Sequence, residues 1–322
     1  MLHWSPDNPD NTRLLPMIQK FSPGFRWVIR AAFVCSLMAA TGMPRVYAAA
    51  YSLPGEDNSL LGAVKKVQLV YEDTFALVAR RAGVGFTGLQ RANPGIDEWL
   101  PGAGVSLALP TSMLLPAAPR EGVVINLAEL RMYFFSDSGQ QVFVYPIGIG
   151  SEGRETPLMQ TSVVGKIENP VWYPPQSVRD RHAAEGDILP RVVPPGPDNP
   201  LGPFAIQLAR SGYFIHGTNA PIGVGQRVSS GCIRMYNHHV ASLVETLPNR
   251  TGVRVINQPY KAGWQGDELY LEAHPPLEGA LDHSQAVAAV IAATNTRDAD
   301  VDWGRVVEVA RTGSGLPVRI TR

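Results

Sequence analysis

The pattern of apolar and polar positions between residues 66 and 110 predicts a small unit of two strands and two helices. Residues 66–71 and 105–110 have the composition of short strands. After the first strand, apolar residues recur at positions i, i+3, i+4 and i+7, as expected for one face of a helix. These four positions are Phe75, Val78, Ala79 and Ala82. The predicted order is therefore strand, helix, helix, strand.

Residues that favour helix ends mark the limits of both helices. Asp73 is expected to cap the first helix and Gly83 to end it. Residues 87–90 form a capping-box pattern, which predicts the start of the second helix. Residues 93–95, Asn-Pro-Gly, are expected to stop that helix.

After residue 120 the pattern predicts a β-rich domain with one clear helix. That helix is expected to begin near Asn237 and to end before Pro248, since its apolar residues recur on one face. Two pairs of strands flank turn sequences and are expected to form hairpins. The expected strands cover 123–127, 131–135, 141–149, 204–208, 213–216 and 253–256.

Proline-rich segments and weaker patterns fill the rest of the chain. Residues 113–120 are predicted to be a linker. Residues 170–203 are predicted to be a long loop of the kind that often shapes a binding site. Residues 258–322 form a C-terminal extension with helical patterns near 284–293 and 301–310, and we identify no chemistry there.

The first 50 residues have the features of a secretory signal peptide. Basic residues precede an apolar run at 31–43, and small residues follow at 48–50, where a signal peptidase would cut. The apolar run is shorter than the about 20 residues that span a bilayer, and an uncleaved anchor is the alternative. We therefore expect an exported protein with no stable membrane span, located in the periplasm of a Gram-negative bacterium.

Charge and composition predict neither a nucleic-acid partner nor a cofactor. Lys and Arg together number 28, as do Asp and Glu, so the chain has no basic excess with which to bind a polyanion. We also predict no metal site. His238 and His239 are adjacent in the sequence, and no second cysteine or carboxylate cluster joins them.

Cys232 is the main candidate for chemistry. The other cysteine, Cys35, lies in the predicted signal peptide, so the mature protein would keep one unpaired thiol. His216 ends an apolar strand 16 residues earlier. It could take the proton of the thiol. A free cysteine has a pKa of about 8.5 and is therefore mostly protonated at neutral pH. Gly231 permits a tight turn, and the N–H groups of Gly231 and Cys232 could face a developing oxyanion.

Two sequence stretches resemble the signature of the L,D-transpeptidase (YkuD-like) family. They are residues 216–223, His-Gly-Thr-Asn-Ala-Pro-Ile-Gly, and residues 229–234, Ser-Ser-Gly-Cys-Ile-Arg. The resemblance extends over about 119–260, and the proline-rich run at 191–202 is similar to the Gram-negative periplasmic branch. It implies a mainly β, β-sandwich-like catalytic domain with one or more short helices.

The resemblance also implies roles for residues around the thiol. Cys232 would be the nucleophile and His216 the general base and acid, with the Gly217 carbonyl orienting His216. Ser230 stands where many members have a second histidine. The candidates for oxyanion or substrate contact are Ser229, Ser230, Gly231 and Arg234, the last of which would hold either the loop or a substrate carboxylate.

The reaction implied by the family takes place on the tetrapeptide stems of peptidoglycan. The thiolate attacks at diaminopimelate, releases the terminal D-alanine and leaves a thioester. An amine then resolves this acyl-enzyme, either from another stem, giving a 3→3 cross-link, or from a lysine of an outer-membrane lipoprotein. Water as the acceptor would make the protein a carboxypeptidase or hydrolase, which the sequence leaves open.

The βααβ unit resembles a LysM module, a family that binds the N-acetylglucosamine-containing backbone of peptidoglycan and chitin. The resemblance depends on residues 72–75, Leu89, 93–97 and 101–102. A structural βααβ domain without a ligand is the alternative. For the whole chain, a second hypothesis is a wall-binding protein with an inactive second domain. The predicted parts are a signal peptide (1–50), a LysM-like module (62–111), a catalytic domain (119–257) and an extension (258–322).

Overall fold

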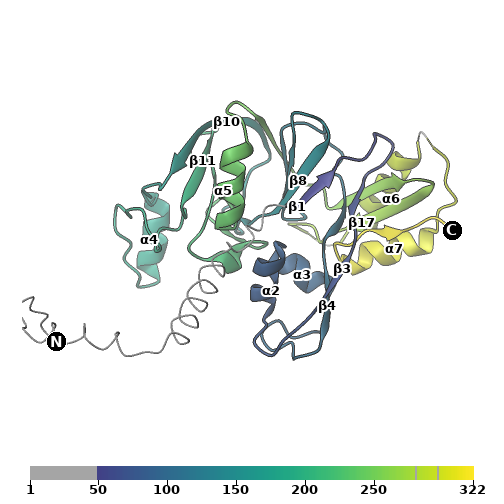
Figure 1. Cartoon of the computed structure of the whole chain (residues 1–322), viewed down its shortest axis with the longest axis horizontal. Coiled ribbons are helices and arrows are strands. Elements are labelled where there is room, and N and C mark those ends of the chain that lie inside the picture. Colours follow the sequence, from purple (N-terminus) through teal and green to yellow (C-terminus); the bar gives the residue numbers. More distant parts are fainter. Residues whose placement is uncertain (1–48, 280, 296) are drawn as a thin grey trace, which may run out of the picture. The chain divides into compact units, whose positions relative to one another are not determined.

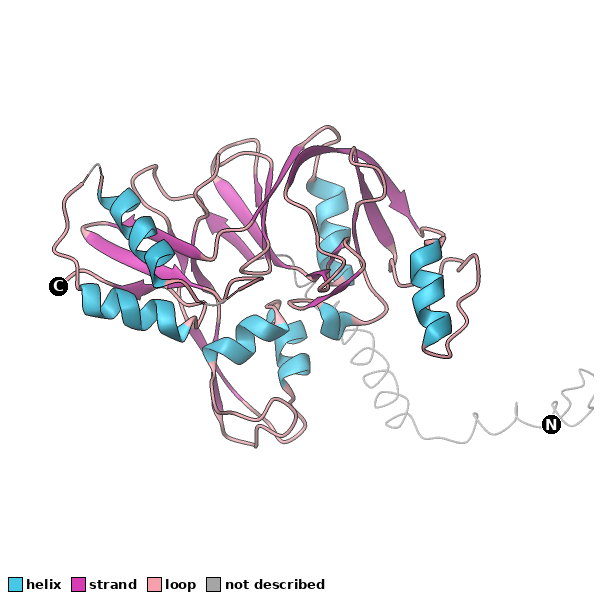
Figure 2. Cartoon of the chain, turned by 180° about the vertical axis from the view of Figure 1, so that it is seen from behind, coloured by secondary structure: helices cyan, strands magenta, loops and turns pink. Residues whose placement is uncertain are grey.

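The computed structural model describes residues 49–279, 281–295 and 297–322 (Figure 1). The predicted signal peptide lies outside the described residues, except for Ala49 and Ala50, which begin strand β1. Strands dominate the described chain and helices are fewer (Figure 2), which confirms the predicted β-rich fold class.

A nine-stranded sheet is the framework of the predicted catalytic domain, with the order β1-β8-β7-β6-β15-β10-β11-β12-β14. Two neighbouring pairs, β6 with β15 and β12 with β14, run parallel. Both expected hairpins form, β7 with β8 and β11 with β12. The nine strands are β1 (Ala49–Ser52), β6 (Val123–Asn126), β7 (Arg131–Phe135), β8 (Gln141–Pro146), β10 (Met159–Glu168), β11 (Phe204–Leu208), β12 (Phe214–His216), β14 (Ile233–Arg234) and β15 (Gly252–Ile256).

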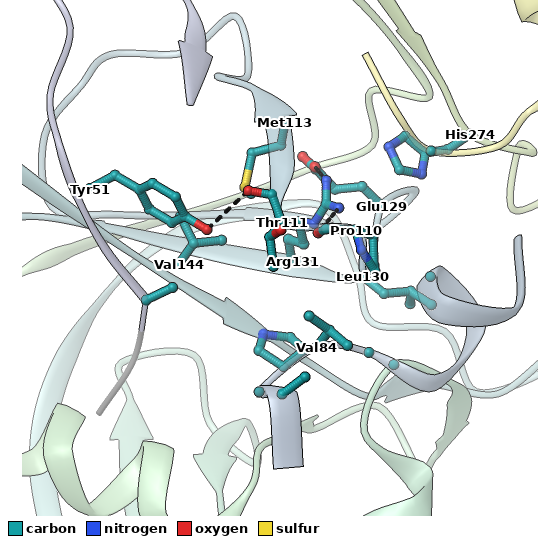
Figure 3. Close-up of a pocket in the computed structure, with 18 residues that line it drawn as sticks. Tyr51, Val84, Pro110, Thr111, Met113, Glu129, Leu130, Arg131, Val144 and His274 are labelled. Carbon is teal, nitrogen blue, oxygen red and sulfur yellow. Dashed lines mark hydrogen bonds and ion pairs between the residues drawn. The ribbon is translucent and has the colours of Figure 1, made fainter. Parts of the chain in front are cut away.

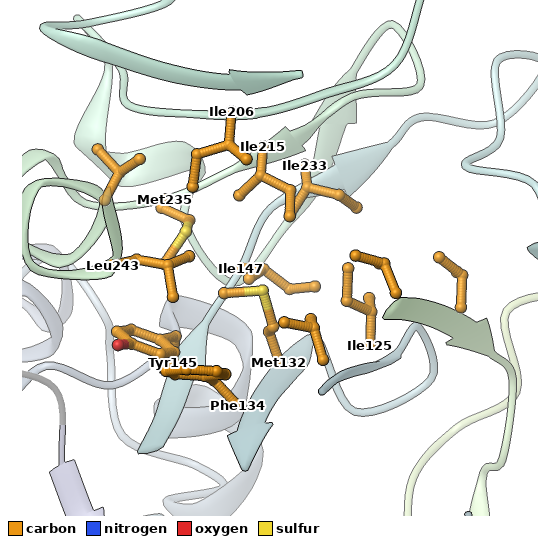
Figure 4. Packing of buried hydrophobic residues seen from close by; sticks show 14 of the residues in the cluster. Ile125, Met132, Phe134, Tyr145, Ile147, Ile206, Ile215, Ile233, Met235 and Leu243 are labelled. Carbon is orange, nitrogen blue, oxygen red and sulfur yellow. The ribbon is translucent and has the colours of Figure 1, made fainter. Parts of the chain in front are cut away.

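The sheet curls so that strands from its two halves enclose one hydrophobic core. Ile125 and Met132, from β6 and β7, belong to the same buried cluster as Ile206 and Ile215, from β11 and β12 (Figure 4). Strands far apart in the sheet therefore face each other across a shared interior, as in a sandwich. Full burial of one such side chain stabilises the fold by about 1.5–3 kcal/mol.

Helix α5 (Asn237–Thr246) closes this core with its apolar face, as predicted. Its first residue, Asn237, does not cap the helix. The Asn237 side chain instead accepts a hydrogen bond from Thr218 N at 2.7 Å and donates one to Thr218 O at 3.0 Å. It thus ties the start of the helix to the chain that follows His216.

The unit between residues 65 and 109 has the predicted order of elements. Strands β3 and β4 pair antiparallel, and helices α2 and α3 pack with them around a separate hydrophobic cluster. The elements are β3 (Lys65–Gln68), α2 (Phe75–Ala82), α3 (Phe86–Ala92) and β4 (Ser106–Leu109). We call this unit the βααβ module.

The helix starts in the module differ from those predicted. Thr74, not Asp73, caps α2 by accepting from Leu77 N. Asp73 instead accepts from Val70 N and pairs with Arg81, where the hydrogen bond from Arg81 lowers the pKa of Asp73. Helix α3 begins one residue before the predicted capping box, with Gly85 at its N-cap. Both predicted ends are confirmed, at Gly83 in a left-handed conformation and at residue 93.

The segment predicted as a linker is packed. Strand β5 (Ser112–Leu114) pairs antiparallel with β2 (Leu60–Gly62). Met113 and Leu115 are buried in a cluster that includes side chains of the central sheet. The prolines that suggested a linker follow this strand. The chain therefore enters and leaves the βααβ module through one antiparallel pair held against the sheet.

Two of the longer elements in the predicted catalytic domain were missed from the sequence, as were the short strands that flank Cys232. The ten-residue strand β10 lies in the sheet between β15 and β11. The proline-rich stretch 170–203, predicted to be a loop, contains helix α4 (Gln176–Ala184). Three shorter elements complete this region: β9 (Ile149–Gly150), which pairs with β13 (Arg227–Ser229), and the 3₁₀ turn η4 (Pro221–Gly223).

The C-terminal extension is a folded layer with its own hydrophobic cluster. Both predicted helices are present, as α6 (His283–Thr294) and α7 (Trp303–Thr312). They pack on a three-stranded sheet that the sequence patterns did not predict. Its strands are β16 (Tyr260–Gln265), β17 (Glu268–Ala273) and β18 (Val318–Arg319).

A buried network of charges joins the extension to the central sheet. Glu129 Oε2 accepts from Lys261 Nζ at 2.7 Å and from Arg131 Nη1 at 3.1 Å. Glu272 Oε1 accepts from Arg131 at 2.8 Å and from His274 Nε2 at 2.7 Å. Burial alone would raise the pKa of Glu272, but the charges of Lys261 and Arg131 and the hydrogen bond from His274 hold it below its ordinary value.

The same network borders a small, partly open cavity of about 50 Å³, in which Tyr51 donates to the Thr111 carbonyl (Figure 3). The ligand atoms of Glu129, Glu272 and His274 lie within 4.8 Å of one another, a spacing that would suit a metal ion. However, Lys261 and Arg131 already supply the positive charge that the two carboxylates require. An additional cation would therefore meet one guanidinium and one ammonium charge, so these residues do not fit a metal site.

Substituting Glu272→Gln should lower the free energy of unfolding by about 3–5 kcal/mol, because the substitution leaves buried cations without a partner. Urea-induced unfolding would measure the change. Glu268→Gln is the matched control in the same strand, since Glu268 pairs with Arg319 at the surface, where both side chains are about half exposed. Equal losses in the two variants would contradict a special role for the buried network.

Candidate active site

The parallel pairing of β12 with β14 brings His216 and Cys232 to one face of the sheet. Ile215 lies opposite Ile233, and His216 lies opposite Arg234. Since side chains alternate along a strand, the two isoleucines point into the core, while His216, Arg234 and Cys232 point to the other face. All three line one open pocket of about 580 Å³.

The imidazole of His216 is buried and oriented by the neighbouring backbone. Its Nδ1 lies 2.7 Å from the Gly217 carbonyl oxygen. A carbonyl oxygen can only accept, so Nδ1 carries the proton and Nε2 keeps a free lone pair. Burial, together with the charge of Arg234, lowers the pKa of His216 to about 4, although the Gly217 carbonyl acts against this shift. His216 is therefore neutral at pH 7 and available as a base.

Cys232 is half-buried, and it is the free cysteine of the described chain. Its Sγ donates to the Gly212 carbonyl at 3.5 Å. Burial raises the pKa of the thiol, and a hydrogen bond from the Phe214 backbone opposes that shift only in part. Thiol and imidazole are thus both neutral at rest, and the proton would have to move as the sulfur attacks.

The turn before Cys232 is held by Ser229. The Ser229 hydroxyl donates to the Cys232 carbonyl at 2.6 Å and accepts from Gly231 N at 3.2 Å. The Gly231 N–H, expected to face an oxyanion, is therefore engaged within the turn in this structure. Gly231 has a φ of +105°, which favours glycine, and its carbonyl accepts from Thr156 Oγ1 at 2.9 Å. Ser229 is buried, whereas Ser230 is exposed at the pocket.

Arg234 is fixed by its backbone and borders the pocket with its side chain. Its N–H and C=O both pair with Gly148, each at 2.8 Å. The guanidinium packs against Gly223, where any side chain would collide with it. Burial lowers the pKa of Arg234, but an arginine stays charged at neutral pH. The structure thus provides a positive charge on the face that carries Cys232 and His216.

The segment 170–203 forms the other wall of the pocket, in agreement with its predicted part in a binding site. Trp172 and Val193 pair through their backbones, and both line the pocket together with Val178 of α4. The buried amide of Asn199 donates to the carbonyl of Pro170 at 2.8 Å and so closes this segment on itself. Sequence reasoning missed Val178 and Asn199, because the surrounding prolines suggested only an irregular loop.

His238 and His239 lie outside this pocket, on α5. Their rings pack against Tyr236, with centroids 5.6 Å and 5.5 Å away, and against each other at 4.3 Å. Burial lowers the pKa of both residues, that of His239 to about 3. The pair therefore belongs to the packing between α5 and its surroundings.

No helix in the described parts of the chain is long and apolar enough to cross a bilayer.

Comparison with known proteins identifies the family. Residues 120–256 match the model of the YkuD L,D-transpeptidase catalytic domain. The chain is 40% identical over 284 residues to the "Probable L,D-transpeptidase ErfK/SrfK" of Salmonella typhimurium, covering 85% of this chain and 92% of that protein. It is also 40% identical over 308 residues to the "Probable L,D-transpeptidase YcfS" of Escherichia coli, covering 92% and 95%.

Among solved structures, the NMR structure of the catalytic domain of the Enterococcus faecium L,D-transpeptidase overlaps 44% of this chain and 100% of its own, with a TM-score of 0.34 and 19% identity. The two enterobacterial relatives, in contrast, match nearly the full length of the chain. The chain therefore belongs to the L,D-transpeptidase family and is an enzyme of that class.

Proposed function

We propose that Cys232 is the nucleophile of this L,D-transpeptidase and that His216 carries the proton. The observation that supports this most directly is the state of His216 in the pocket shared with the thiol. With Nδ1 bonded to the Gly217 carbonyl and a pKa of about 4, its Nε2 is an unprotonated base at neutral pH. A base held in this tautomer can accept the thiol proton and later return it.

The proposed substrate is the tetrapeptide stem of peptidoglycan, the polymer on which this family acts. As Cys232 Sγ bonds to the carbonyl carbon at the L-centre of diaminopimelate, its proton moves to His216 Nε2. The bond from that carbon to the D-alanine nitrogen breaks, and the departing amine takes the proton from His216. A thioester remains until an acceptor amine attacks the same carbon and gives a proton to His216 Nε2. The C–S bond then breaks, and His216 returns that proton to the sulfur, which restores the thiol.

Two positive features of the pocket suit this substrate. Because Gly231 N–H is engaged by Ser229, the Cys232 N–H is our candidate donor to the oxyanion. Arg234 supplies a charge that could pair with one of the carboxylates of the stem. Ser230, in place of a second histidine, is exposed at the pocket and is our candidate for a substrate contact.

For the acceptor, we propose an amine, from another stem or from an outer-membrane lipoprotein, with water as the hydrolytic alternative. The cell-wall substrate and the predicted signal peptide together support a periplasmic location. A wall-binding protein with an inactive second domain is less consistent with a thiol and an oriented base in one pocket.

Substituting Cys232→Ser should abolish release of D-alanine from purified tetrapeptide muropeptides, because a hydroxyl is much harder to ionise than a thiol. The variant should keep the unfolding curve of the wild-type protein, since the two side chains are nearly the same size. Mass spectrometry should also show an adduct on Cys232 of the wild-type protein after incubation with a carbapenem. Release of D-alanine by the variant at the wild-type rate would remove Cys232 from the mechanism.

The rate of acylation by a carbapenem should be nearly constant between about pH 5 and pH 7 and should fall only as the pH approaches about 4, where His216 becomes protonated. Stopped-flow measurement of the rate against pH would test this. His216→Ala should lower the rate by about 10²–10⁴-fold. His238→Ala is the control, because His238 lies outside the pocket. An acidic limb near pH 6.5 would show that His216 is not held in the buried, neutral state.

We also propose that the βααβ module is a LysM module that binds glycan. Tyr71, Trp99 and Leu100 are 87%, 54% and 84% exposed. They lie on the two loops that flank the helices, and Phe75 N, at the start of α2, donates to the Glu98 carbonyl of the second loop at 2.9 Å. Exposed aromatic rings of this kind offer flat apolar faces on which sugar rings can stack.

Trp99→Ala should weaken binding to purified sacculi about tenfold, which corresponds to about 1.4 kcal/mol. A pull-down with sacculi at increasing protein concentration would measure the change. Trp303→Ala is the matched control, since Trp303 is 45% exposed in α7, outside the module. Equal binding by the Trp99 variant and the wild-type protein would assign the βααβ module a purely structural role.

A further inference from the structure

Residues 217–231 join the two catalytic candidates, and we call them the connector. The connector contains little regular structure of its own, only the turn η4 and the three-residue strand β13. Its course therefore depends on what it touches. A segment that leads directly into the turn before Cys232 must be held from outside if the thiol is to keep a fixed position.

The βααβ module holds the connector at its midpoint. Phe86 N donates to the Val224 carbonyl at 3.2 Å, and Thr87 N donates to the Gly225 carbonyl at 3.3 Å. These N–H groups belong to the first turn of α3, where a helix has no partners of its own. Carbonyl groups of the connector thus accept hydrogen bonds from the free N–H groups at the start of α3. The same bonds fix the position of the connector backbone.

Two glycines make this close approach possible. A Cβ at Gly225 would lie well inside van der Waals contact with the backbone of Gly85 and Phe86, and Gly225 also has a φ of +84°. Nearby, Tyr236 OH donates to the Val84 carbonyl at 3.0 Å and ties the module to the residue before α5. Backbone atoms of the module are therefore in direct contact with the catalytic domain.

The C-terminal extension holds the connector two residues further on. Arg227 Nη1 donates to the Leu277 carbonyl at 2.6 Å, and Leu277 itself packs against the core of the catalytic domain. On the sheet side, Gly225 N donates to the Ile147 carbonyl at 3.1 Å and Ile149 N donates to the Gln226 carbonyl at 3.0 Å. Three parts of the chain therefore converge on residues 224–227.

We propose that the βααβ module and the C-terminal extension position Cys232 through the connector, with Gly225 and Arg227 as the positioning residues. The inference depends on the proposed roles of Cys232 and His216. A shift at residues 224–227 passes along β13 to Ser229, whose hydroxyl holds the Cys232 carbonyl. His216 would not follow, because it is anchored separately in β12, with Gly217 N bonded to the Phe204 carbonyl at 3.0 Å. The shift would therefore change the geometry of the thiol relative to its base.

The first test is Gly225→Ala in the full chain, which forces the module away from the connector. The second-order rate of Cys232 acylation by a carbapenem should fall at least tenfold, and kcat for a soluble muropeptide should fall more than KM rises. Gly139→Ala is the matched control. Gly139 also has a positive φ, +67°, but no atom within 4 Å of the added Cβ, so it introduces backbone strain without a clash.

The second test removes the other support and does not depend on whether the Gly225 variant folds. Arg227→Met keeps the length of the side chain but loses the donor to Leu277, and should also slow acylation. Arg227→Lys, which keeps a donor at the end of the chain, should restore most of the rate. Unfolding curves for every variant would show whether the rates follow stability alone.

Acylation within twofold of the wild-type rate for Arg227→Met, and for Gly225→Ala where it folds, would overturn the inference. So would a loss in Gly139→Ala equal to that in Gly225→Ala. Failure of the wild-type protein to be acylated at Cys232 would remove the proposed function itself, and this inference with it. Normal acylation of the wild-type protein and of the variants would remove the inference alone.

Discussion

Two buried carboxylates, those of Glu129 and Glu272, require cations, and this requirement joins three parts of the chain. Arg131 comes from the central sheet and Lys261 from the C-terminal extension, while Lys261 Nζ also donates to the Leu114 carbonyl of β5 at 2.6 Å. Charges that are out of reach of water must be paired, so none of these parts can separate without exposing or stranding a charge. The extension is therefore a built-in layer, and its position also fixes the carbonyl that Arg227 uses.

Local patterns in the sequence were sufficient to predict the helices and strands whose apolar side chains face one core. The hairpins, α5 and the helices of the module and the extension show regular periodicity, and the structure has them close to the expected limits. Strand β10 was missed because only Val163 of its ten residues is buried, so it shows no alternation. Helix α4 likewise buries only Val178 and lies between prolines. Strand β5 was read as a linker because prolines follow it.

The candidate site was predictable where it depends on neighbours in sequence. The bond between His216 and the Gly217 carbonyl and the tight turn at Gly231 are local, and the motif contains both. The supports at Gly225 and Arg227 arise from contacts that the folded chain brings together, and no spacing within the motif indicates them, because their partners lie in other parts of the sequence. The bond from Gly231 N–H to the Ser229 hydroxyl joins two residues of the motif itself, but the residue types alone do not show that the turn points one toward the other.

Strand β1, at one end of the nine-stranded sheet, overlaps the end of the predicted signal peptide. Its residues, from Ala49 to Ser52, pair with β8 and cover what would otherwise be an open row of backbone groups. They also come at the end of the predicted signal peptide. A cut after residue 50, the predicted end of that peptide, would remove Ala49 and Ala50 and leave only Tyr51 and Ser52 of this strand to pair with Val142 and Gln141 of β8. The length of this edge pairing would therefore depend on where the predicted signal peptide is cut.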